Sequence, residues 1–264
     1  MKVLHDLHIH THLSICGDDS ATPEAYVAVG EKCGLTTFGF VDHVWDTAVS
    51  PAPNDFYAKQ DMAHIKKLVL PSADGKTLLR GCEADLAADG TLGLSEKEAK
   101  NLDYVLAVHS HSQWAEMIPD AVRRSPKSLA NALCERFSLL VEHPLSKYIT
   151  AIAHPFFPHG NRDNMDDVLF QISDETLEDL FADAAYKNIA LEINATAFSM
   201  YDINAMHRGE LFRIYEVAKD CGCKFVFGTD CHNPAKYEAL HHRLVILADM
   251  LELTKADICP RFAK

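Results

Sequence analysis

Short apolar segments rich in β-branched and aromatic residues recur along the whole chain. Segments of this kind are typical of strands covered on both faces, because such strands need apolar side chains at nearly every position. Seven segments fit this description: residues 3–9, 36–41, 77–83, 104–109, 148–154, 189–194 and 224–229.

Segments with a helical period lie between these strands. The first has the clearest ends, since Thr22 suits the N-cap, Pro23 the first helical position and Gly34 the termination. Ser173, directly before two acidic residues, marks another helix start. The predicted helices cover residues 23–33, 55–69, 95–101, 126–142, 174–187, 205–221 and 235–251.

The alternation of seven strands with helices predicts parallel β/α units, and therefore an α/β fold. The most loop-like segments, 46–56 and 156–167, are polar and rich in proline, glycine, asparagine or aspartate. Neither is long enough to be a linker between domains. We therefore expect residues 1–264 to form a single domain.

Six of the seven predicted strands end in, or are closely followed by, histidine or a carboxylate. In a parallel barrel the carboxyl ends of the strands converge on one face, where active sites are built. A random scatter of histidines would not repeat this placement. The residues concerned are His8, His10, Asp42, His43, Glu83, His109, His111, His154, Asp230 and His232.

The chain contains 15 histidines, and histidine is the commonest metal ligand. Side chains two apart in an extended segment point to the same side, so His8 and His10 can face one cavity. Asp230 and His232 repeat that spacing with one carboxylate. Mixed imidazole and carboxylate ligands suit zinc, manganese or iron. The number of candidates favours two or three divalent ions, which can clamp the oxygens of phosphoryl transfer.

Charge and composition restrict the possible partners. The net charge of -13 argues against nucleic acid, because acidic surfaces repel phosphates. No apolar run reaches the ~18 residues that a membrane span needs, and residues 1–12 lack the apolar core of a signal peptide. The eight cysteines form no CxxC pair and are expected to be reduced thiols. These features predict a cytoplasmic protein with no membrane partner; the oligomeric state stays open.

The successive segments DLHIHTHLS, VDH, GCEADL, LAVHSHS, AIAHP, ALEIN and FGTDCHNP resemble the motifs of the PHP (polymerase and histidinol phosphatase) superfamily. The resemblance extends from about residue 4 to residue 235. It implies a distorted seven-stranded (β/α)7 barrel, similar to a TIM barrel, with a trinuclear metal site that hydrolyses phosphoesters. The ligands it implies are His8, His10, His43, Glu83, His109, His154, Asp230 and His232, together with one residue of the loop after His10.

The identity of the loop ligand is ambiguous, because this chain departs from the family pattern there. Counting back from Pro23 selects Asp18, and counting forward from His8 selects Cys16. We favour Asp18, since a hard carboxylate suits a phosphatase metal, whereas a thiolate would favour zinc. Asp19 is a third possibility.

Roles beyond metal binding are assigned from chemistry and position. Arg162, in the polar loop after His154, is our candidate for the phosphate-binding cation, with Lys236 as the alternative. His232 or His111 could protonate the leaving group. The remaining candidates are Asp42 and Glu192 for orienting imidazoles, His12 for lining the pocket and His159 for contacting substrate, whereas His5, His64, His143, His207, His241 and His242 are expected to lie outside the site.

These features together predict a metal-dependent phosphatase acting on a small phosphate monoester, such as histidinol phosphate or a nucleotide. A nuclease acting on nucleotide or DNA ends and an amidohydrolase-type metal hydrolase are the alternatives. A non-catalytic metal-binding domain is disfavoured, because the ligand set is complete. The substrate and the metal stay open, since specificity depends on the loops.

Overall fold

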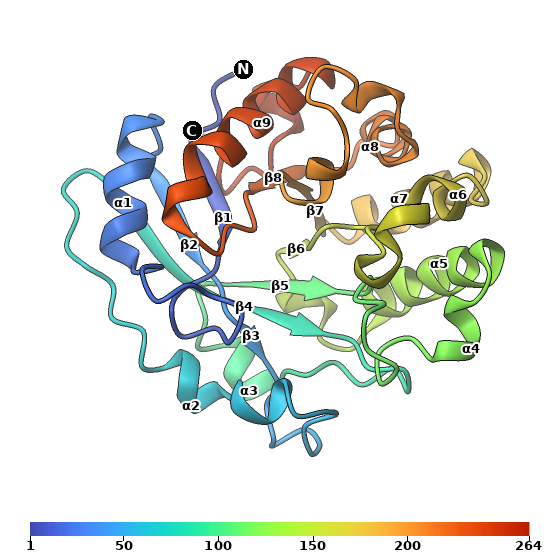
Figure 1. Ribbon diagram of the computed structural model, residues 1–264, viewed down its shortest axis with the longest axis horizontal. Helices are drawn as coiled ribbons and strands as arrows, with labels where there is room; N and C mark the ends of the chain where they lie inside the picture. The colour runs from blue at the N-terminus through green and yellow to red at the C-terminus, as the bar shows by residue number, and fades with distance from the viewer. Residues whose placement is uncertain (264) are drawn as a thin grey trace.

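The seven predicted strands are present and form one parallel sheet that curls into a nearly closed barrel (Figure 1). The computed structural model describes residues 1–263. An eighth, short strand, β3 (His43–Val44), pairs with β4 beyond the end of β2. The strand order is β1 (His5–Ile9), β2 (Thr37–Phe40), β4 (Thr77–Asp85), β5 (Tyr104–Val108), β6 (Ala151–Ile152), β7 (Ala190–Asn194) and β8 (Phe225–Gly228).

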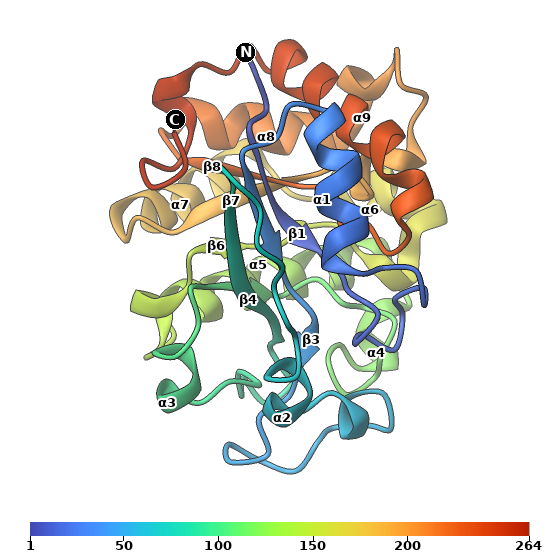
Figure 2. The same cartoon turned by 90° about the vertical axis from the view of Figure 1, so that its left-hand side faces the viewer.

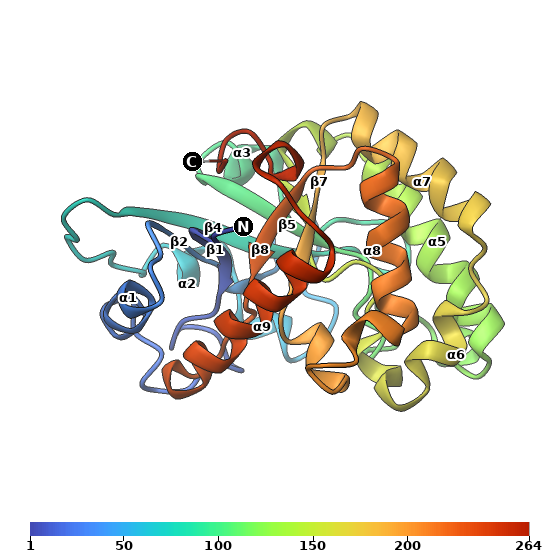
Figure 3. The same cartoon turned by 90° about the horizontal axis from the view of Figure 1, so that it is seen from above.

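Helices surround the strands, and the longer ones pack on the outside of the sheet (Figures 1 and 3). The predicted cap residues are confirmed: Thr22 accepts a hydrogen bond from the amide of Ala25, and Ser173 accepts one from Thr176. Gly34 follows the first helix with a positive φ of 85°. The helices of ten or more residues are α1 (Pro23–Lys32), α5 (Pro126–Glu142), α7 (Asp174–Tyr186), α8 (Glu210–Asp220) and α9 (Tyr237–Met250).

Three segments differ from the prediction. The helix expected over 55–69 is a 3-10 turn, Tyr57–Lys59, followed by the short helix α2 (Met62–Ile65), because Asp61 caps a new helix start. The loop expected over 156–167 contains a 3-10 helix, His159–Asn164, and enters α6 (Met165–Leu169). The remaining short helices are α3 (Glu96–Ala99), which was predicted, and α4 (Asp120–Arg123), which was not. No helix within residues 1–263 is both long and apolar enough to cross a membrane.

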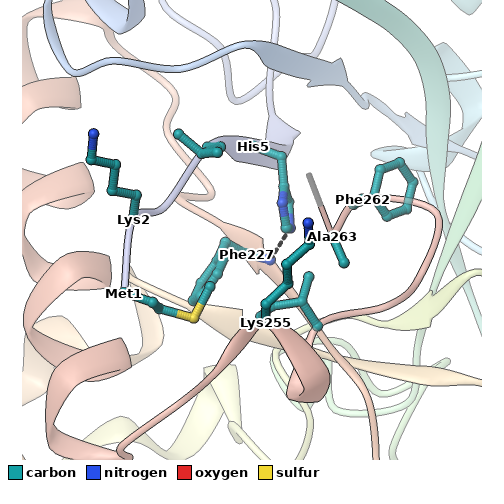
Figure 4. A pocket seen from close by; sticks show the side chains of 9 residues that line it. Met1, Lys2, His5, Phe227, Lys255, Phe262 and Ala263 are labelled. Atoms are coloured by element: carbon teal, nitrogen blue, oxygen red, sulfur yellow. Dashed lines mark hydrogen bonds between the residues drawn. The ribbon is translucent and has the colours of Figure 1, made fainter.

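The barrel closes along a seam between β1 and β8, two strands that Figure 2 shows together with the amino terminus above them. Along this seam, side chains replace part of the backbone ladder. The Asp6 carboxylate accepts hydrogen bonds from the amide and the hydroxyl of Thr229, at 3.1 and 2.7 Å. The His5 ring accepts one from the amide of Phe227, at 3.0 Å (Figure 4). Among residues 1–263, backbone hydrogen bonds cross the seam at its carboxyl end, from Asp230 to His8 and from His10 to Cys231. Met1 and Ala263 lie together at the opposite end of this seam, beside His5 and Phe227.

Candidate metal centre

Buried histidines and carboxylates converge at the carboxyl ends of the strands, as the sequence predicts. Potential ligand atoms form overlapping groups whose members lie within 4.8 Å of one another. One group has His8, His10 and Asp230; a second has His43, Glu83 and His111; a third has His111, His154 and His159; a fourth has His10, Cys16, His43 and His232. Because these groups share members, the arrangement suits several adjacent ions better than one.

Glu83 lies at the middle of the centre. Its Oε1 is 2.9 Å from His154 Nε2, and its Oε2 is 2.9 Å from His43 Nδ1 and 3.4 Å from His10 Nε2. Glu83 Oε2 and His43 Nδ1 are buried yet make no hydrogen bond of acceptable geometry. Buried polar atoms without partners are costly, and an ion that both atoms bound would satisfy the two of them. The donor set is of the kind that binds zinc, manganese or iron.

His8, His10 and Asp230 form the part of the centre that crosses the seam. His8 Nε2 is 3.1 Å from His10 Nε2, and Asp230 Oδ1 is 3.6 and 3.3 Å from these two nitrogens. Burial alone would raise the pKa of Asp230, but the neighbouring imidazole of His8 holds it well below its usual range. The carboxylate is therefore ionised, as a ligand must be.

The loop after β1 brings Cys16 to the centre. The Cys16 sulfur belongs to the same group of ligand atoms as His43 and His232. Burial raises the pKa of this thiol, but hydrogen bonds with His232 and His43 outweigh it and lower the pKa to about 6. A thiol with this pKa is largely a thiolate at neutral pH, which is the form that binds metal.

Asp18, the favoured loop residue, is not brought to any of these groups. Its Oδ1 accepts hydrogen bonds from the amide and hydroxyl of Ser20, at 2.9 and 2.6 Å, and its Oδ2 accepts one from Asn233. Within residues 1–263, Asp19 also lies outside the groups. The loop turns tightly at Gly17, where a Cβ would approach the carbonyl oxygen of Thr11 to 2.1 Å. This turn directs Cys16 inward and Asp18 outward.

His109 also lies outside the ligand groups, although the sequence analysis includes it among the ligands. Its Nδ1 donates to the carbonyl of Leu133 at 3.1 Å, and its Nε2 accepts from the amide of Phe156 at 3.0 Å. Both ring nitrogens are therefore engaged by the backbone. The strand ends at Val108, and His111 instead faces Glu83, with its Nε2 3.8 Å from Glu83 Oε1.

Two carboxylates lie against imidazoles of these groups and fix their orientation. Glu192 Oε1 lies 2.8 Å from His8 Nδ1, and its other oxygen accepts from the amide of His154 at 2.7 Å. Asp85, which the sequence analysis missed, lies 2.9 Å from His111 Nδ1. Contacts of this kind fix the tautomer of a ligand histidine and strengthen its donation to metal. Asp85 lies two residues beyond Glu83 on the same strand. Side chains two apart on a strand point to the same face, so the sequence could have placed Asp85 beside Glu83.

Arg136 is a second residue that the sequence analysis missed. Its buried guanidinium, on α5, donates to the carbonyls of His109 (2.7 Å), Ala87 (3.1 Å) and Leu86. It thereby holds the turns that follow β4 and β5. No local pattern distinguishes it from the other cations of a predicted helix.

A cavity of about 220 Å³ opens over the ligands. Phe56 and Trp114 form its aromatic wall, with ring centroids 4.7 Å apart. Arg162 lines the cavity; Lys236, the alternative cation, is absent from its lining. Among residues 1–263, the only carboxylates in that lining are Glu83 and Asp230.

The remaining candidates of the sequence analysis, Asp42 and seven histidines, lie outside the ligand groups of the described residues. His12 Nδ1 is 3.4 Å from the carbonyl oxygen of Ala21, and His12 does not line the cavity. Asp42 accepts hydrogen bonds from Thr11 and lies 4.0 Å from His10 Nδ1. Outside the ligand groups in the described residues are also His5, His64, His143, His207, His241 and His242.

A second cavity, of about 230 Å³, lies at the amino end of the barrel (Figure 4). His5, Phe227 and Phe262 line it, together with the exposed Lys2 and Lys255. Within residues 1–263 it contains no group of metal-ligating side chains. The chemistry is therefore concentrated at the carboxyl end.

Comparison with known proteins agrees with this geometry. The sequence model of one protein family, the PHP domain, matches residues 6–196 of this chain. Two relatives named as probable phosphatases, from Aliivibrio fischeri and Photobacterium profundum, are each 26% identical over 237 and 233 residues, covering 88% of this chain and 79% of each relative.

A solved structure shares the fold. It is the histidinol phosphate phosphatase of Lactococcus lactis subsp. lactis, complexed with zinc, L-histidinol and phosphate. Its TM-score to this chain is 0.61 at 17% identity, with 96% of this chain and 95% of that chain covered.

Proposed function

Because the chain belongs to the PHP domain family, we propose that it is a metal-dependent phosphatase that hydrolyses a small phosphate monoester. The observation that carries the proposal is the set of overlapping ligand groups around the buried Glu83. Two or three divalent ions held there would supply a nucleophile from water near neutral pH and neutralise the phosphoryl oxygens. The likeness to a structure containing zinc and phosphate supports the same chemistry.

We assign the metal ligands from their placement. The proposed set keeps the residues for which both the sequence pattern and the geometry argue. It replaces Asp18 by Cys16 and His109 by His111, because only the replacements face the other ligands. The proposed ligands are His8, His10, Cys16, His43, Glu83, His111, His154, Asp230 and His232.

The residues around the cavity have separate tasks. Arg162 supplies a guanidinium for the phosphate, which it can bind in a bidentate manner. His111 and His232, our sequence-based candidates for the proton donor, serve better as ligands, since the Nδ1 of His111 is held by Asp85 and that of His232 lies 2.9 Å from the Asp230 carbonyl oxygen. Each then offers only Nε2 to the centre.

The aromatic wall favours an ester whose alcohol carries a flat ring. Phe56 and Trp114 can stack against such a ring. Histidinol phosphate and nucleoside monophosphates both present a ring. The net charge of -13 disfavours a polynucleotide.

The test is a hydrolysis assay that measures inorganic phosphate released from monoesters and, by chromatography, the products of a phosphodiester and of an amide panel. Metal-free protein is reconstituted separately with zinc, manganese or iron and offered histidinol phosphate, nucleoside monophosphates and a phosphodiester. We expect metal-dependent hydrolysis of a monoester that carries a ring. Cleavage of the diester alone would point to a nuclease, and hydrolysis of an amide panel alone would point to an amidohydrolase; either result would contradict the proposal.

A further inference from the structure

His159 reaches the centre from the 3-10 helix after β6 and is absent from the proposed ligand set. Its ring packs edge-on against His111 and His154, with centroids 4.6 and 4.5 Å apart. One of its nitrogens lies within 4.8 Å of the ligand nitrogens of both rings. His159 Nε2 is buried and has no hydrogen-bond partner. Within residues 1–263 nothing satisfies this buried nitrogen, and its ring lies against the rings of His111 and His154.

Arg162 determines which nitrogen of His159 carries the proton. Its Nη2 lies 3.2 Å from His159 Nδ1, and its Nε donates to the His159 carbonyl at 3.2 Å. A guanidinium only donates hydrogen bonds, so Nδ1 must accept. A neutral imidazole has one accepting nitrogen and one N–H. Nε2 therefore carries the hydrogen, and a nitrogen that carries a hydrogen has no lone pair for a metal.

From this we propose that His159 is a phosphate-binding residue, whose Nε2–H donates a hydrogen bond to a phosphoryl oxygen of the substrate. The inference rests on the proposed function, because it assumes that a phosphate binds over the ligands. Arg162 then has two tasks, as a charge for the phosphate and as the residue that fixes the tautomer of His159.

The surrounding chain keeps this pair in place. The Gly160 amide donates to the Ser112 hydroxyl at 2.9 Å, and a Cβ on Gly160 would come within 2.6 Å of the Ser112 carbonyl oxygen. The Arg162 guanidinium lies over the Phe157 ring, 5.4 Å from its centroid. Phe156 has a φ of 63°, a left-handed conformation that turns the chain back after His154. A donor positioned in advance binds with less ordering cost.

The test compares His159→Leu with His159→Gln, whose amide nitrogen replaces Nε2 as a donor. The probe is inorganic phosphate, and its affinity for zinc-loaded protein is measured by calorimetry alongside the metal content. We expect His159→Leu to weaken phosphate binding by about tenfold, the usual effect of losing one hydrogen bond to an anion. His159→Gln should recover most of the affinity, and both should keep the wild-type metal content. His207→Leu is the control, because His207 is an exposed histidine that lies outside the ligand groups.

A spectroscopic measurement tests the tautomer directly. Nitrogen-15 NMR of histidine-labelled, zinc-loaded protein should show His159 protonated at Nε2 alone, and Arg162→Met should allow the other tautomer. Loss of one ion in His159→Leu, or a metal-bound Nε2 in the spectrum, would show that His159 is a ligand and overturn the inference. Unchanged phosphate affinity in both His159 variants would overturn it as well.

These outcomes are separable from the fate of the proposed function. A wild-type protein that binds phosphate through His159 but hydrolyses no ester would refute the phosphatase and leave the inference standing. A protein that hydrolyses its ester with the same KM in His159→Leu would refute the inference alone. If His159→Leu fails to fold, the nitrogen-15 spectrum of the wild-type protein still decides, because a metal-bound Nε2 would overturn the inference and a protonated, metal-free Nε2 would support it.

Discussion

Glu83 is the side chain on which the centre most depends. It is 1% exposed and is approached by imidazoles from three neighbouring segments. Burial alone would raise its pKa, but the charges of His43 and His8 hold that pKa well below its usual range. An ionised carboxylate so surrounded can bridge two ions.

We expect Glu83→Gln to lower phosphatase activity by at least ~100-fold and to reduce the metal content, because an amide neither bridges nor neutralises ions. Elemental analysis and the phosphate-release assay measure both effects. Glu98→Gln is a matched control, since Glu98 is also nearly buried but pairs with Lys66. Similar metal loss in the two variants would argue against a bridging role for Glu83.

The loop ligand gives a second prediction at this scale. Cys16→Ser should cost one bound ion and shift the metal preference away from zinc, because the thiolate is the soft donor of its group. Asp18→Asn should retain all ions, since its contacts are with Ser20 and Asn233. Elemental analysis of both variants decides, and the reverse pattern would restore Asp18 as the ligand.

The two residues that we reassign show what a sequence can reveal about a site. Ligands at strand ends could be predicted, because an apolar run makes the end of a strand visible. Cys16 could not be chosen over Asp18, because their directions depend on a distant contact: Gln60 accepts a hydrogen bond from the amide of Ile15. His109 and His111 were ambiguous for a similar reason, since the chain turns after Val108.

At the scale of elements, β7 and β8 must approach closely to support the centre. Gly228 on β8 allows this, because a Cβ there would lie 1.7 Å from Glu192 Oε1 and 2.6 Å from the Cβ of His8. The absence of a side chain on β8 thus gives Glu192 its place beside the His8 ring.

We expect Gly228→Ala to destabilise the fold by about 1–3 kcal/mol through overpacking and to weaken metal binding by displacing Glu192. Thermal denaturation and metal titration measure the two effects. Gly90→Ala is the control: its φ of 85° makes alanine cost about 1–2 kcal/mol, but no atom lies near the added Cβ. Metal affinity that falls equally in both variants would contradict this account.

The bounds of helices that carry their own capping residues were predicted best. The bounds of α5, Pro126–Glu142, agree with the prediction, because Ser125 and Pro126 specify the start. The segment 55–69 was predicted poorly, because the carbonyl of Gln60 accepts a hydrogen bond from the distant amide of Trp45 and Asp61 restarts the helix. A tertiary contact of this kind leaves no periodic signal.

At the scale of the whole molecule, the proposed ligands come from strands all around the barrel. Ions bound there stabilise the native state alone, so chelation should lower the melting temperature. An ion at a thousandfold excess over its Kd contributes about 4 kcal/mol, which is about 10 °C for a domain of this size. Calorimetry with and without chelator measures the shift. An unchanged melting temperature, with ions removed, would show that the barrel does not depend on them.

The seam between β1 and β8 has a consequence for the tendency of the metal-free protein to aggregate. His8 and Asp230 lie on opposite sides of it and belong to one ligand group. An ion bound by both would add to the backbone hydrogen bonds between these strands at the carboxyl end and to the contacts of Asp6 and His5 further along the seam. Strands freed at such a seam present unpaired edges, which recruit other chains. Chains that lack metal would therefore be prone to aggregate as well as inactive, which light scattering of the metal-free protein would measure.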